Sequence, residues 1–90
     1  MKKNFKEQFD NLKKIIDANI DTLTALIKQS DKLSVVINSL EEKKDDEECK
    51  KTIESLEAIR SGISKSIEEL VSQTRELFKT YDKLVDEVFK

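Results

Sequence analysis

Residues 5–40 read FKEQFDNLKKIIDANIDTLTALIKQSDKLSVVINSL, and hydrophobic side chains return along them in alternating steps of four and three. A four-three repeat places one apolar stripe along one side of an α-helix. This stretch therefore predicts a long amphipathic helix. The positions of its repeat are Phe5, Phe9, Leu12, Ile16, Asn19, Leu23, Leu26, Ser30, Leu33, Ile37 and Leu40.

A second repeat of the same kind occupies the other half of the chain. Its positions are Ile53, Leu56, Arg60, Ile63, Ile67, Leu70, Thr74, Leu77, Tyr81, Leu84 and Val88. Between the two repeats lies the charged segment 41–48, EEKKDDEE, which contains no apolar residue. Two apolar stripes joined by a polar turn predict an all-α fold, an antiparallel helical hairpin with coiled-coil packing. We expect one domain over residues 1–90, with helices over about 4–42 and 48–89 and a hinge over about 43–47.

The helix ends carry capping signals. Asn4 followed by Glu7 resembles a capping box, so the first helix is predicted to start near Asn4. Lys43 and Lys44 suit the carboxyl end of that helix, and the acidic residues 45–48 suit the amino end of the next. This reversal of charge predicts a turn between Lys44 and Asp45.

An alternative fold depends on two possible breaks. Ser30-Asp31 and Ser61-Gly62 fall at the same height in a hairpin, where layers pair residues whose numbers sum to about 90, such as Phe9 with Tyr81. Ser and Asp can cap a new helix, and Gly weakens a helix interior. Breaks at both places would give a monomeric four-helix bundle. Continuous helices are favoured because neither repeat changes phase there.

The composition limits the class of protein. Of the 90 residues, 40% are charged and 37% hydrophobic, Pro is absent, and the net charge is −2. A periodic apolar set with balanced charge is typical of long helices rather than of disorder. No long basic stripe is present, so binding to nucleic acid is not expected.

The sequence also bears on location. The longest apolar run is residues 35–37, far too short to span a membrane. The basic start, residues 1–6, is not followed by the apolar segment of a cleaved signal peptide. Cys49 is the single cysteine and fits a reducing compartment. We therefore expect a cytoplasmic protein that does not contact membranes.

Few residues offer chemistry. His is absent, which removes the usual general base and the commonest metal ligand. Gly62 is the only glycine, so there is no phosphate-binding loop, and the acidic hinge lacks the glycine of a calcium loop. Cys49 is interpreted as a small packing residue near the hinge. We expect no catalytic residues, no metal and no cofactor, and hence no enzyme.

Polar residues interrupt the core repeats at Asn19, Ser30, Arg60 and Thr74. Polar core residues lower stability and can fix register. Arg60 is expected level with Ser30. Its guanidinium would either reach Asp31 or extend over the core into water.

A further apolar stripe runs beside the core. It contains the predicted interaction residues Ile20, Ile27, Val71, Phe78, Val85 and Phe89, and other apolar residues outside the core are Ile15, Val36 and Ile59. Two helices cover only their narrow seam, so a single hairpin would leave these side chains in water. The stripe predicts association into a homo-oligomeric helical bundle, a dimer first, through the half of the rod away from the hinge, where Ile15 is expected to join Ile20 and Ile27. Phe78 is the expected anchor.

In size and shape, the predicted hairpin resembles the small helical-hairpin partners and substrates of type VII secretion. Those proteins carry Trp-Xaa-Gly in the turn, which the hinge lacks. Their export signal is an aromatic residue followed four residues later by an acid, and Phe78 with Asp82 has that spacing. Chains of this composition also resemble phage and bacterial proteins that inhibit by covering a partner's surface.

These observations predict a non-catalytic protein–protein interaction module: an adaptor, chaperone or inhibitor of a larger protein. The alternatives are a secreted hairpin or secretion partner of the type VII kind, and a protein that binds a small ligand in a pocket of an oligomer.

Overall fold

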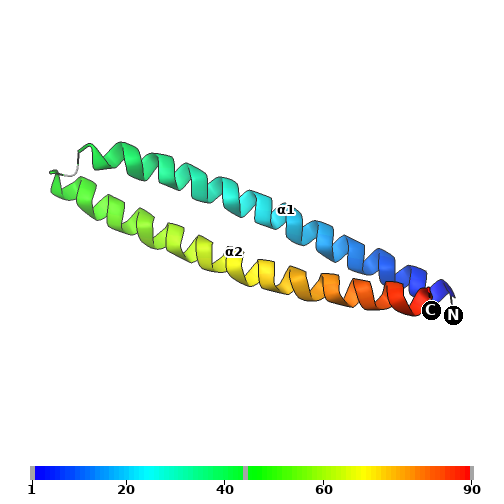
Figure 1. The fold of residues 1–90 in the computed structure, drawn as a ribbon. Helices are drawn as coiled ribbons and strands as arrows, with labels where there is room; N and C mark the ends of the chain where they lie inside the picture. The colour runs from blue at the N-terminus through cyan, green and yellow to red at the C-terminus, as the bar shows by residue number, and fades with distance from the viewer. Residues whose placement is uncertain (1, 44, 90) are drawn as a thin grey trace.

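Two long helices make up the fold. The computed structural model describes residues 2–43 and 45–89, with side chains from Phe5 onward. Helix α1 spans Lys2–Glu41 and helix α2 spans Glu47–Val88. The helices lie alongside each other for most of their length, and the beginning of α1 lies near the end of α2 (Figure 1). The predicted all-α, hairpin-like architecture of two helices is confirmed.

The turn between the helices is short and hydrogen-bonded. The amide of Lys43 donates to the carbonyl of Leu40 at 2.9 Å, and the amide of Asp46 donates to the carbonyl of Lys43 at 3.1 Å. Asp46 has extended backbone angles, and its carboxylate accepts a hydrogen bond from the amide of Glu48 at 3.0 Å. Asp46 is therefore the N-cap of α2. The turn predicted between Lys44 and Asp45 involves Lys44, which lies outside the described residues.

The start of α1 differs from the expectation. The helix begins at Lys2, so Asn4 lies inside it rather than at its N-cap. Lys is a good helix former, and neither Pro nor Gly precedes Asn4 to stop the helix there. A capping signal contributes only about 1 kcal/mol, which does not prevent the extra half-turn.

Both helices run without a break through the two suspected positions. Ser30-Asp31 and Ser61-Gly62 are helical, so the alternative of a monomeric four-helix bundle is wrong. Gly62 is exposed, and a Cβ atom placed on it would meet nothing within 4 Å. Glycine in a helix interior lowers stability by about 1 kcal/mol, and this loss is small compared with the stabilisation from the core contacts on either side of Gly62.

The core follows the two predicted repeats. Every repeat position from Phe5 to Leu40 and from Ile53 to Leu84 is buried or half-buried, and Val88 is exposed. The rings of Phe9 and Tyr81 pack edge to face with their centroids 5.2 Å apart, which confirms the predicted pair.

The core is nevertheless thin. Among the described residues, only Ile16, Ile37, Ile53 and Thr74 are buried. The chain exposes 7291 Å² of surface, whereas a compact protein of its mass is expected to expose about 5,400 Å². Its radius of gyration is 20.0 Å, against about 12 Å for a compact domain of this length. A single hairpin therefore leaves long sides of both helices in contact with water.

Candidate protein-interaction faces

The core seam separates two long faces of the rod. Core positions come in pairs that are three residues apart, such as Ile37 and Leu40. The residue directly before the first member of a pair lies on one side of the seam, and the residue directly after the second member lies on the other side. Val36 and Ile59, which precede Ile37 and Arg60, line one shallow hollow of about 340 Å³ together. A second hollow, near the turn, is lined by Glu41, which follows the core residue Leu40, and by Lys50, Ile53 and Glu54 of α2. Each face is thus built from both helices.

The predicted stripe lies on one of these faces, which we term the apolar face. Ile20, Ile27, Val71, Phe78 and Val85 each directly follow a core residue, and Phe89 lies one helical turn after Val85. Ile20, Ile27 and Phe78 are exposed by 44–48% and Phe89 by 81%, whereas Val71 and Val85 are half-buried. Ile20, Val71, Phe78, Val85 and Phe89 lie on the half of the rod away from the turn. Ile27 does not, because it lies 14 residues before the end of α1 at Glu41 and 25 residues after its start at Lys2.

Ile15 does not belong to the apolar face. It precedes Ile16, as Val36 precedes Ile37 and Ile59 precedes Arg60, so these three lie on the opposite side of the seam. Ile20 is five positions after Ile15, which corresponds to a rotation of about 140° around a helix. The expectation that Ile15 joins Ile20 and Ile27 is therefore wrong.

The side that contains Ile15 is nearly free of charge. We term it the uncharged face. It runs between positions 8 and 39 of α1 and between positions 52 and 80 of α2, and the only charged residues along it are Lys32, Glu69 and Glu76. Its members on α1 are Gln8, Asn11, Ile15, Ala18, Thr22, Ala25, Gln29, Val36 and Ser39. Its members on α2 are Thr52, Ser55, Ile59, Gly62, Ser66, Gln73 and Thr80.

Sequence reasoning missed the uncharged face, although a signal for it was present. Gln8, Asn11, Ile15, Ala18 and Thr22 begin a four-three repeat of their own, parallel to the core repeat. A search for apolar residues overlooks it, because its common property is the absence of charge in a chain with 40% charged residues.

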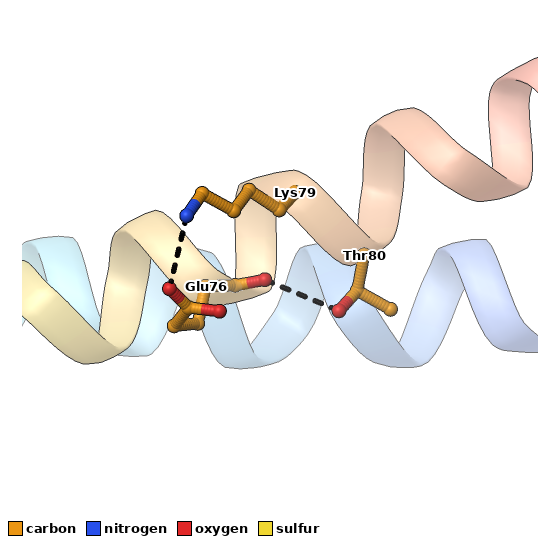
Figure 2. A network of polar contacts seen from close by, with 3 residues as sticks. All are labelled: Glu76, Lys79 and Thr80. Carbon is orange, nitrogen blue, oxygen red and sulfur yellow. Dashed lines mark hydrogen bonds and ion pairs between the residues drawn. The ribbon is translucent and has the colours of Figure 1, made fainter.

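Four hydroxyl groups on the uncharged face, those of Thr22, Ser39, Thr52 and Thr80, are hydrogen-bonded within their own helices. Figure 2 shows the hydroxyl of Thr80 donating to the carbonyl of Glu76 at 3.1 Å, beside the ion pair of Lys79 with Glu76. The same bond to the preceding turn, at 2.9–3.0 Å, is made by Thr22, Ser39 and Thr52. Because each of these hydroxyl groups already donates a hydrogen bond, a partner can cover them without leaving a buried donor unpaired.

Two polar contacts cross the core. The amide of Asn19 donates to the hydroxyl of Thr74 at 3.3 Å, and that hydroxyl donates to the carbonyl of Leu70 at 2.7 Å. The guanidinium of Arg60 donates to the hydroxyl of Ser34 at 3.1 Å rather than reaching Asp31. Ser34 lies one turn beyond Ser30, on the side toward which the Arg60 side chain leaves the core.

The described residues offer no assembled chemical site. Cys49 is half-buried near the turn, and no group of three or more His, Cys, Asp or Glu residues in this part of the chain is placed to hold a metal ion. Neither described helix has an apolar stretch sufficient to cross a membrane.

Comparison with known proteins gives no further guidance, since no family model, curated protein or solved structure matches this chain.

Proposed function

We propose that this chain is a non-catalytic protein–protein interaction module: an antiparallel coiled-coil hairpin that binds a larger protein through its apolar face. In this role it acts as an adaptor, chaperone or inhibitor. The observation that carries the proposal is the gathering of exposed Ile20, Ile27, Phe78 and Phe89 on one face of a rod whose own core is thin.

The surroundings of the apolar face suit a protein partner. Lys13, Asp17, Arg75 and Asp82 flank it and alternate in sign. Protein interfaces typically have an apolar centre with a polar rim, and large aromatic side chains contribute most of their binding energy. Phe78 has this position, with the apolar side chains of Val71 and Val85 one heptad away on either side.

The proposal is tested by affinity capture from the native host with tagged wild-type, Phe78→Asp and Val35→Asp chains. Val35 is exposed by 64% and belongs to neither face, so Val35→Asp is a matched control for introducing a carboxylate. We expect a protein that the wild type and Val35→Asp retain and Phe78→Asp loses. Equal retention by all three chains contradicts a role for the apolar face.

A second candidate function rests on the Phe78–Asp82 spacing. Both residues are exposed and lie one turn apart on α2, as a type VII export signal requires. If the chain is exported, Asp82→Asn should block its appearance outside the cell while leaving its cellular level unchanged. Export that is insensitive to both Phe78→Ala and Asp82→Asn removes this candidate.

A further inference from the structure

We infer that two copies of this chain pair through their uncharged faces, which leaves both apolar faces free for a partner. This assigns self-association to the side of the rod opposite the stripe that the sequence had suggested. It also goes beyond the proposed function, because it names the occupant of a face that the function does not use.

The first argument is the distribution of charge. A two-fold dimer places the same face of each copy against the other, so charges on that face meet their own copies or lose their water. The uncharged face excludes charge at nearly every position, whereas the apolar face is bordered by Lys13, Asp17, Arg75 and Asp82. A neutral face gives no selectivity for a charged partner, but it lets two identical faces meet without repulsion.

The second argument is Gly62. It sits in the interior of α2 without a positive φ, and a Cβ atom placed there would meet open space. The hairpin alone therefore does not require glycine, which weakens a helix. A glycine on the uncharged face allows the backbone of another helix to approach closely, and Ala18 and Ala25 on the same face allow it on α1.

The third argument is size and shape. The uncharged face extends over about 31 residues of α1, or roughly 45 Å, and the rod is 15 Å across. Its area is thus roughly 700 Å², close to the 800 Å² or so that each partner contributes to a standard interface. The hollow between Val36 and Ile59, floored by Leu33 and Ile63, provides an apolar recess within it.

Charge also selects the orientation. The alignment of Asn19 with Thr74 places Ala18 within one residue of the level of Glu76, and Ala25 within one residue of the level of Glu69. A two-fold axis along the rod, with both turns at one end, places each glutamate opposite an alanine of the other copy. The reverse orientation brings the two Glu69 side chains together near the middle of the face, so the first orientation is preferred.

The test is sedimentation equilibrium of the full chain, with helicity checked by circular dichroism. We expect a wild-type dimer and an increase of the dissociation constant of at least tenfold in Ile59→Glu and in Thr22→Glu. Thr22 is an exposed polar position, so its variant remains informative if Ile59→Glu does not fold. Val35→Glu and Phe78→Asp should dimerise like the wild type.

Gly62→Ala gives an independent test, because the substitution should stabilise the protein if Gly62 lies on a free surface and should weaken the dimer if Gly62 lies in the interface. On a free surface, alanine stabilises the helix and raises the melting temperature without affecting association. In the proposed interface it weakens the dimer several-fold, and Ser72→Ala, on the outer side of α2, does not. The inference is overturned if the wild type is a monomer, or if Phe78→Asp is the only variant that dissociates the dimer. If Phe78→Asp instead loses a captured partner, that result concerns the proposed function alone.

Discussion

The amide of Asn19 on α1 donates to the hydroxyl of Thr74 on α2, and this is a side-chain hydrogen bond that fixes the alignment of the two helices. The contact lies within an otherwise apolar part of the core, where Thr74 is only 7% exposed. A polar pair in such a place favours the register in which both groups are satisfied, at some expense of stability.

The first prediction concerns this pair. Thr74→Val alone removes the acceptor of the Asn19 amide and should lower the free energy of unfolding by about 1 kcal/mol. Asn19→Leu with Thr74→Val removes both partners and should be neutral or stabilising. Urea unfolding of the wild type, both single variants and the double variant measures the coupling. Additive effects of the single variants would show that the bond does not couple the helices.

The second prediction compares two isoleucines of α1. Ile37 is 2% exposed and Ile27 is 48% exposed. Ile37→Ala should therefore lower the free energy of unfolding by about 2–4 kcal/mol, through lost burial and a cavity. For Ile27→Ala in the isolated chain, we expect a loss of less than about 1 kcal/mol. Chemical unfolding followed by circular dichroism checks both, and similar losses would contradict the assignment of Ile27 to an exposed face.

The third prediction concerns the cap of α2. The Asp46 carboxylate accepts the amide of Glu48, so Asp46→Ala should cost about 1 kcal/mol of stability. Asp45→Ala is the matched control, because it removes the same charge one residue earlier, before the cap. An equal effect of the two changes in thermal unfolding would show that loss of negative charge, not loss of the cap, is what matters.

The fourth prediction concerns Cys49, which is half-buried close to the turn. Cys49→Ala and Cys49→Ser should retain partner binding and change the free energy of unfolding by less than about 1.5 kcal/mol, since a small residue is replaced by a small one. Loss of binding by a folded variant would reveal a reactive role for the thiol.

Most of the fold could be predicted because it depends on local periodicity. The four-three repeats from Phe5 and from Ile53 identified both helices and nearly every core residue, and Val88 alone among them is exposed. The start at Lys2 could not be predicted from Asn4, since a capping preference is weak compared with the continuation of a helix.

The faces could be predicted only in part. The sequence grouped Ile20, Ile27, Val71, Phe78 and Val85 because they share a heptad position, and their role in binding stays a prediction. Ile15 was grouped with them wrongly, because it was judged by its hydrophobicity alone, whereas its place directly before a core residue puts it on the other side of the seam. The contact of Arg60 with Ser34 instead of Asp31 likewise depends on the side to which a long side chain leaves the core.

The last prediction follows from the thin core and the excess exposed surface. If two copies cover each other's uncharged faces, folding and association are linked, and the melting temperature must rise with protein concentration. Circular dichroism melts between about 5 and about 500 µM should show this rise for the wild type and for Val35→Glu. The melting temperature of Ile59→Glu should stay constant over the same range and lie below that of the wild type at the highest concentration. A wild-type melting temperature that does not depend on concentration would mean that the hairpin is stable on its own, and that its uncharged face is not covered by a second copy.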